Sequence, residues 1–327
     1  MVETRGTAPL VTVFGGSGFV GRYVVRALAQ RGWRVRVAVR RPDLAVHLQP
    51  LGTVGQIRPI QANLRYRASV DAAVAGADAV VNLVGILVPS GRQTFDAVQA
   101  FGARAVAEAA RAAGVGRLVQ MSAIGADSGS ASAYARTKAA GEIAALETIP
   151  DAVIVRPSIV FGPEDDFFNK FASMARISPV LPLIGGGATL FQPVYAADVG
   201  EAIARLVEGA GTPGATYELG GPETLSFRDC LETVCELTGR RRLLLPIPFG
   251  AMELMAKFTD WAPGAPITRD QIELLKSDNV VSDAAVADGR TLEGLGIAPR
   301  TLDAILPTYL YRYSVHGQYD RYKMKAL

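Results

Sequence analysis

Tyr134 and Lys138 are the two side chains of this chain whose types and spacing best suit proton transfer. If residues 133–147 form a helix, as their alanine-rich pattern predicts, residues four apart lie on the same face of it. A lysine ammonium beside a phenol lowers the pKa of the phenol, which favours acid–base work near neutral pH. Such a pair also arises often by chance, so its meaning depends on the segments around it.

A glycine-rich segment near the N-terminus supplies a second chemical signal. It follows the β-branched run 10–14 and opens an amphipathic run that ends near residue 30. In that context the glycines allow a sharp turn close to a pyrophosphate, and the helix N-terminus offers amide donors and a positive dipole. We predict a dinucleotide site here, against the alternative of a glycine-rich turn without a ligand. The predicted contacts are Gly15, Ser17, Gly18, Phe19, Val20 and Gly21.

The end of the next strand-like run, residues 35–39, indicates which dinucleotide is bound. About 20 residues after the glycines an NAD-binding chain usually carries an acid against the ribose hydroxyls. This chain has Arg40 and Arg41 there, and no carboxylate before Asp43. Guanidinium groups form charge-assisted hydrogen bonds with a 2′-phosphate, which an acid would repel. We predict NADPH or NADP over NAD; the alternative is that both arginines only solvate a strand end.

The segments that must position these residues alternate between strand-like and helix-like runs. Helical alanine-rich runs at 70–74, 95–113 and 133–147 separate apolar runs of strand length. This alternation predicts an α/β fold with a Rossmann-type, doubly wound parallel sheet that helices cover on both faces. The predicted strands are residues 10–14, 35–39, 57–61, 79–83, 117–122 and 152–156.

After Pro157 the pattern loosens into loops rich in proline and glycine, with helices predicted near residues 199–208, 226–238 and 268–276. We interpret this half as a smaller, irregular α/β lobe. The predicted domains are an NAD(P)-binding Rossmann domain at 9–162, with parts of 190–220 packing back on it, a second lobe at 163–308, and a C-terminal tail at 309–327.

Composition narrows the class of protein. A chain of 327 residues with 49% hydrophobic residues can build one large domain or two. A net charge of +3 without a long basic stripe argues against nucleic-acid binding. Cys230 and Cys235 lie five apart in a predicted helix and face different ways, so we predict neither a disulfide nor a metal site.

The sequence also shows no recognisable membrane-spanning or targeting segment. No apolar run approaches the ~20 residues of a spanning helix. Residues 1–9 resemble neither a signal peptide nor an amphipathic presequence, so we expect the chain to stay where it is synthesised.

These segments together resemble the extended short-chain dehydrogenase/reductase superfamily. The glycines are spaced three and three, and the Tyr134 and Lys138 pair falls between the fifth and sixth strands, where that superfamily places it. In active relatives the phenol shuttles the proton. The resemblance also implies cofactor contacts at Asn63 and Leu64 beside the adenine, at Val84 and Gly85 beside the ribose, and at Pro157 and Ile159 beside the nicotinamide.

The chain differs from this superfamily at the position of the serine that assists catalysis. Aligned by strand register, the hydroxyl that helps polarise the substrate in active relatives falls on Ala123. Ser122 lies one residue early and faces the other way if the strand continues, although a twist at the strand end could restore it. The resemblance therefore implies a catalytic site that is weakened or vestigial.

Five segments resemble a narrower family, the nucleotide-binding accessory subunit of respiratory complex I, the proton-pumping NADH:ubiquinone oxidoreductase. They are residues 18–25, 161–169, 171–174, 192–195 and 267–271, within a likeness from about Pro9 to about Pro307. This resemblance implies an atypical reductase that holds NADPH tightly, far from the electron path, as a structural or assembly subunit. It implies a peripheral place on the mitochondrial matrix side or on the cytoplasmic face of a bacterial inner membrane.

Two other functions remain open on the sequence. Tyr134 and Lys138 favour a free-standing NADPH-dependent reductase or nucleotide-sugar epimerase, whereas Ala123 and the narrower segments favour the subunit. A redox-sensing regulator that binds NADPH and reports it to a partner would share every cofactor residue.

The C-terminal residues 309–327 concentrate tyrosines and cations. They hold half of the chain's ten tyrosines, and tyrosine and arginine are residue types that anchor interfaces. We predict that this tail docks onto neighbouring complex I subunits. The alternatives are that its tyrosines pack on the chain's own second lobe, or that its basic end is attracted to anionic lipid headgroups.

Overall fold

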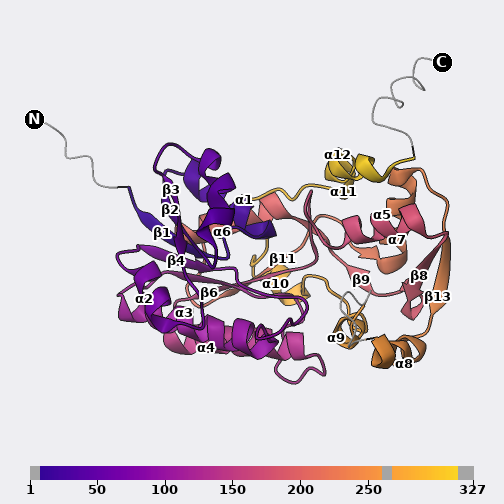
Figure 1. Ribbon diagram of the computed structural model, residues 1–327, viewed down its shortest axis with the longest axis horizontal. Coiled ribbons are helices and arrows are strands. Elements are labelled where there is room, and N and C mark those ends of the chain that lie inside the picture. The colour runs from indigo at the N-terminus through magenta and orange to yellow at the C-terminus, as the bar shows by residue number, and fades with distance from the viewer. Residues whose placement is uncertain (1–7, 260–266, 316–327) are drawn as a thin grey trace, which may run out of the picture. The chain divides into compact units, whose positions relative to one another are not determined.

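The structure is a computed structural model that describes residues 8–259 and 267–315 (Figure 1). The chain divides into two compact units. Within the described ranges, the first unit comprises residues 8–156, 197–218 and 284–297, and the second comprises residues 157–196, 219–283 and 298–315.

The first unit is built on a seven-stranded sheet with the order β3-β2-β1-β4-β5-β6-β11. The pairings from β3 to β6 are all parallel, which confirms the predicted fold class. The strand order reverses between β1 and β4, where such sheets bind ligands beyond the carboxyl ends of their strands. The strands are β1 (Leu10–Phe14), β2 (Arg34–Val39), β3 (Ile57–Gln61), β4 (Ala79–Asn82), β5 (Leu118–Met121), β6 (Val153–Pro157) and β11 (Thr216–Leu219).

Helices cover both faces of this sheet (Figure 1). On one face lie α1 (Phe19–Gln30) and α6 (Ala196–Val207); on the other lie α2 (Arg67–Val74), α3 (Phe101–Ala112) and α4 (Ala133–Thr148). Small residues let these helices approach closely: a Cβ at Gly141 of α4 would lie 2.5 Å from the Gln99 carbonyl oxygen. The short helix α10 (Asp283–Ala287) also belongs largely to this unit.

Two irregular helical segments depart from the expected pattern. The 3₁₀ segment η1 (Pro42–Leu51) follows β2, and the π-helical turn η2 (Asp96–Ala100) precedes α3. The sequence predicted one helix over 95–113, because a search for a 3.6-residue period does not reveal a wider turn within it.

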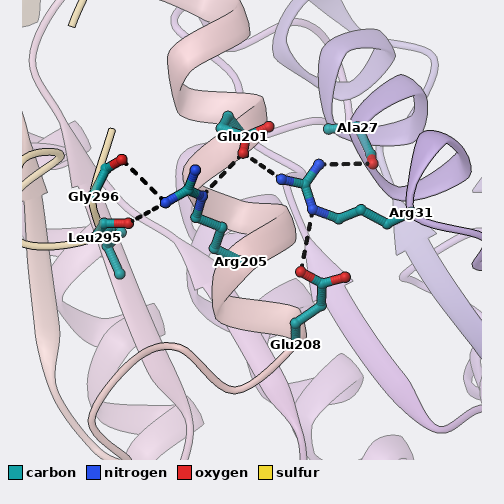
Figure 2. A network of polar contacts seen from close by, with 7 residues as sticks. All are labelled: Ala27, Arg31, Glu201, Arg205, Glu208, Leu295 and Gly296. Carbon is teal, nitrogen blue, oxygen red and sulfur yellow. Dashed lines mark hydrogen bonds and ion pairs between the residues drawn. The ribbon is translucent and has the colours of Figure 1, made fainter. Parts of the chain in front are cut away.

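A network of ion pairs fastens α6 to the end of α1 (Figure 2). Arg31 donates to Glu201 and, from Nε, to Glu208 at 3.2 Å. Arg205 donates to Glu201 at 3.0 Å and to the carbonyl oxygens of residues 295 and 296 at 2.6 and 3.1 Å. Burial raises the pKa of Glu201, but the bonds from the two arginines outweigh it and hold the pKa below its ordinary value. The network thus joins three separate stretches of the chain into the first unit.

The second unit combines short sheets with small helices. In its described residues β7 (Val160–Phe161) pairs with β10 (Val194–Tyr195), and β8 (Val180–Ile184) pairs with β13 (Leu243–Ile247), both parallel. The strand β9 (Leu190–Phe191) pairs antiparallel with β12 (Leu225–Ser226). The helices are α5 (Phe168–Ile177), α7 (Phe227–Thr238), α8 (Phe249–Thr259), α9 (Arg269–Leu274), α11 (Leu302–Ile305) and α12 (Pro307–Leu310).

The first residues of the predicted C-terminal tail lie in the core of the second unit. Tyr309 is 4% exposed, and its hydroxyl donates to the buried carboxylate of Asp165 at 2.5 Å. Arg312 donates to the carbonyl oxygen of Pro163 at 2.7 Å and to Oδ1 of Asn169. Tyr309 therefore packs on its own lobe, while Tyr319, Tyr322 and the other residues of 316–327 lie outside the described residues.

Among the helices of residues 8–259 and 267–315, none is long and apolar enough to span a membrane. Cys230 and Cys235 both lie in α7 and form no disulfide. Burial raises the pKa of Cys230 to about 12, so its thiol stays protonated. The described acids, histidines and cysteines form no group that could hold a metal ion.

Candidate dinucleotide site

The glycine turn between β1 and α1 has the backbone that a phosphate cradle needs. Gly15 adopts φ +76°, and a Cβ there would lie 3.3 Å from Val84 in the segment after β4. A Cβ at Gly21 would lie 2.3 Å from the Gly15 carbonyl oxygen, so only glycine lets α1 approach the turn this closely. Ser17, Phe19 and Val20, which are half-buried, complete the same turn.

The N-terminus of α1 is open to an anion. Its N-cap is Gly18, no side chain caps the helix, and its first turn holds no acid. The first amides of a helix have no partner within it, and the helix dipole favours negative charge there. The turn therefore fits a pyrophosphate.

Arg40 and Arg41 follow the end of β2 but differ in their surroundings. Arg41 forms an ion pair with Asp43, with Nη2 2.8 Å from Oδ2. The hydrogen bond from Arg41 lowers the pKa of Asp43 below its ordinary range. Arg40 is exposed and makes no ion pair with any residue that the structure describes. Of the two cations, Arg40 is thus the one without a competing carboxylate.

Asn63 and Leu64, predicted to lie beside the adenine, both make local contacts after β3. The side-chain Oδ1 of Asn63 accepts a hydrogen bond from the Arg65 amide at 3.2 Å, and the Asn63 carbonyl oxygen accepts one from Ser69. Leu64 packs over α3, where a Cβ on Gly102 would lie 2.8 Å from Leu64 Cδ1. Leu64 is therefore held in place by the core beneath it.

Tyr134, Lys138 and Gly85 come together at the start of α4. Lys138 Nζ lies 5.7 Å from the centre of the Tyr134 ring, and a Cβ on Gly85 would lie 3.1 Å from the same nitrogen. Burial lowers the pKa of Lys138 to about 8, although the nearby Glu142 carboxylate acts in the opposite direction. The Phe95 ring packs edge-on against Tyr134 at 5.9 Å between centroids. The site therefore holds a buried ammonium beside a phenol.

Sequence reasoning missed a buried ion pair one helical turn beyond Lys138. Arg156 of β6 donates to both carboxylate oxygens of Glu142, with distances of 2.8 and 2.6 Å. This bidentate contact raises the pKa of Arg156. The spacing could have identified Glu142, because Tyr134, Lys138 and Glu142 follow each other at intervals of four and therefore share one face of α4.

Ser122 and Pro157 lie at the carboxyl ends of the neighbouring parallel strands β5 and β6. Ser122 directly follows β5, is 3% exposed, and its hydroxyl has no hydrogen-bond partner among the described residues. Its amide donates to the Val155 carbonyl at 2.7 Å, so it continues the sheet pairing, and Ala123 is half-buried. Pro157 ends β6, where the chain passes into the second unit, and Ile159 packs against an apolar cluster of that unit.

Comparison with known proteins agrees with this geometry. The NAD dependent epimerase/dehydratase family matches residues 11–220. A protein of Arabidopsis thaliana named NADH dehydrogenase [ubiquinone] 1 alpha subcomplex subunit 9, mitochondrial, is 34% identical over 94% of this chain and 79% of its own length. A ceramide reductase of Caulobacter vibrioides is 37% identical over 64% of this chain and 63% of its own.

Solved structures share the fold. An NADPH-dependent quinone oxidoreductase of Escherichia coli, determined with NADPH, superposes with a TM-score of 0.71 at 20% identity, covering 92% of this chain and 99% of its own. The fold is therefore that of an NAD(P)-binding protein. The chain belongs to the NAD dependent epimerase/dehydratase family, and within it to the family of the NADH dehydrogenase [ubiquinone] 1 alpha subcomplex subunit 9 proteins.

Proposed function

We propose that this protein is an accessory subunit of respiratory complex I that holds NADPH as a structural ligand and turns over no substrate. The observation that carries the proposal is the 34% identity to a named subunit of NADH dehydrogenase [ubiquinone], which extends over 94% of this chain. That likeness covers both units, whereas the family shared with epimerases and dehydratases covers residues 11–220.

NADPH is the proposed form of the cofactor because of the charge beyond β2. Arg40 offers an uncompensated guanidinium where an NAD-binding chain carries an acid, and a 2′-phosphate would supply its counter-charge. The pyrophosphate would lie against the amides at the start of α1, and Lys138 would donate to the ribose hydroxyls from its buried position.

A structural role fits the reacting end of the site better than turnover does. An active reductase of this superfamily uses a hydroxyl to polarise its substrate, but Ala123 stands at that position here and Ser122 lies one residue earlier. Tyr134 and Lys138 then serve to hold the ribose rather than to transfer a proton. By this reading the protein lies peripherally, on the matrix side of the mitochondrial membrane or on the cytoplasmic face of a bacterial one.

The test is to purify the chain, identify its nucleotide by mass spectrometry, and compare thermal midpoints with and without it. Ligand at a hundredfold excess over its Kd stabilises a fold by about 2.7 kcal/mol, so stripping should lower the midpoint by several degrees. Added NADPH should restore the midpoint of the stripped protein.

The alternative is a free-standing NADPH-dependent reductase or epimerase, and the same preparation tests it. Reduction of ketone and quinone substrates should not exceed the rate of a Tyr134→Phe variant measured at saturating nucleotide. Robust turnover that this variant abolishes would contradict the structural role. Purified protein without nucleotide, and with no shift on adding NADPH, would contradict the cofactor.

A further inference from the structure

The second unit presents large aliphatic side chains to solvent along one edge. Ile177, the last residue of α5, is 78% exposed, and Leu243 and Leu245 of β13 are 63% and 47% exposed. The helix α8 follows β13 directly (Figure 1). Its Leu254 and Met255 are 57% and 47% exposed. Single exposed leucines are ordinary, but several on consecutive elements indicate an interaction surface.

The fold forces these side chains outward. β13 pairs with β8, and because side chains alternate along a strand, Leu244 packs into the apolar cluster of this unit while its two neighbours point away from it. Ile247 has the strand parity of Leu243 and Leu245 but packs into the cluster at the end of β13, so the outward-facing leucines of this strand end at Leu245. On α8 the inward residue is Met252, which is 2% exposed. The exposed leucines thus belong to β13 and α8, two elements that also pack other residues into the apolar cluster of the second unit.

Hydrogen bonds place the end of α5 beside the start of β13. Arg242 Nε donates to the carbonyl oxygen of Ala175 at 2.7 Å, and the Leu243 amide donates to Pro179 at 3.0 Å. Ile177 lies between these two anchor points in the chain. The end of α5, with Ile177, therefore lies beside the start of β13, with Leu243.

Four arginines border this surface without a carboxylate partner among the described residues. Arg176 and Arg241 are exposed and form no ion pair there. Arg240 donates to the carbonyl oxygen of Tyr313, and Arg242 donates to carbonyl oxygens only. We call the arginines 176 and 240–242, together with Ile177, Leu243 and Leu245, the basic–apolar edge.

We propose that the basic–apolar edge docks the protein on the surface of a membrane that contains anionic lipid. Interfacial binding scales with the apolar area that enters the acyl boundary and with the attraction of cations to anionic headgroups, and this edge provides both. A protein strand added beside β13 is disfavoured, because Pro246 lacks the amide that such pairing needs. The inference does not depend on the nucleotide or on assembly with other chains.

The experiment is co-flotation of the full chain with vesicles of phosphatidylcholine alone or mixed with phosphatidylglycerol. The chain should float with the anionic vesicles and be released by salt. Arg176→Gln and Arg241→Gln should each lower the partition coefficient about fivefold, which corresponds to ~1 kcal/mol per charge. Leu243→Ser with Leu245→Ser should lower it about tenfold.

The matched controls are the same kinds of substitution made at exposed residues of the first unit. Arg111→Gln removes an exposed arginine, and Val54→Ser removes an exposed aliphatic residue, so neither should change flotation. All variants should keep the thermal midpoint of the wild type, because the altered side chains are exposed.

Three results would overturn the proposal. The first is equal flotation of the chain with neutral and anionic vesicles, and the second is flotation of the edge variants at the wild-type level. The third is no flotation with either kind of vesicle; if the edge variants then weaken binding to a protein, the edge is a protein-binding surface and not a membrane-binding one. A truncated variant that lacks residues 316–327 tests whether the charges of that segment, and not those of the edge, cause flotation. If that deletion alone abolishes flotation, the edge is not the docking site; if flotation persists, the edge is supported.

Discussion

At the scale of single residues, cofactor choice depends on a competition for Arg41. Asp43 already holds this guanidinium in an exposed ion pair, so Arg40 is left to bind a 2′-phosphate. We expect Arg40→Ala to weaken NADPH binding about tenfold, because it removes a charge-assisted bond worth roughly 1.5 kcal/mol or more. Replacing Arg40 and Arg41 together should cost at least tenfold, and NADH should be affected little. Fluorescence titration with both nucleotides measures the difference.

Asp43→Asn is the matched control for this competition. It frees Arg41 and removes a negative charge, so NADPH should bind more tightly while NADH changes little. If Arg40→Ala weakens both nucleotides equally, the arginine is not a 2′-phosphate ligand and the choice of NADPH is wrong.

Lys138 should make stability depend on pH in the alkaline range. Burial lowers its folded-state pKa to about 8 from the ordinary value of 10.5. Between these values the unfolded chain binds the proton and the folded chain does not, so stability rises with pH across this window, by ~3 kcal/mol at most. Denaturant unfolding at pH 7.5 and 10 should show this gain for the wild type relative to Lys138→Met.

The control for Lys138 is Lys276→Met, which removes an exposed lysine whose pKa the Glu253 and Glu273 hydrogen bonds raise. This variant should keep the gain between the two pH values. Equal pH dependence of the wild type and Lys138→Met would mean that the Lys138 amine is not buried as a cation near neutral pH.

At the scale of elements, the attachment of α6 depends on one shared carboxylate. Glu201 accepts from both Arg31 and Arg205 and has a side chain 30% exposed, whereas Glu208 is 41% exposed and contacts Arg31 alone. We expect Glu201→Gln to lower the free energy of unfolding by ~1 kcal/mol and Glu208→Gln by less than ~0.5 kcal/mol. Urea unfolding measures both, and the reverse ranking would contradict the network in Figure 2.

The elements of the first unit could be predicted from the sequence because each signal was local. The predicted strands at residues 10–14 and 57–61 match β1 and β3, and the predicted helix at 133–147 matches α4 within a residue. The glycine turn was recognisable for the same reason, since its strand, glycines and helix are contiguous.

In the second unit the helices predicted at 226–238 and 268–276 match α7 and α9, but the strand pairing could not be predicted in this way. β8 and β13 both contain proline within short apolar runs, and their pairing joins residues 180 and 243, which no local pattern relates. At the site, the pair of Glu142 with Arg156 was missed because it joins two separate elements, and the pair of Arg41 with Asp43 was missed although the two residues are close in sequence. A sequence shows that the charges exist, but which partners they choose depends on backbone geometry.

At the scale of the whole molecule, the C-terminal segment is bonded to the second unit through residues up to 315. Arg312, the Tyr313 carbonyl and the Val315 amide are bonded within the second unit. Removing residues 316–327 should therefore leave the thermal midpoint and NADPH affinity unchanged while releasing the chain from its assembly. Removing residues from Tyr311 onward should also lower the midpoint, because these bonds are lost.

Calorimetry of the two truncated chains separates docking from folding. If the shorter deletion already unfolds the protein or releases its nucleotide, residues 316–327 belong to the fold and do not dock.

The central claim, an NADPH-holding accessory subunit of complex I, is tested most directly by native electrophoresis of detergent-solubilised membranes from the source organism, with mass spectrometry of the separated bands. The chain should migrate with the large assembly that oxidises NADH and reduces quinone, and NADPH should be recovered from that band. Migration of the chain as a free monomer or small oligomer, with none in the quinone-reducing band, would contradict the account.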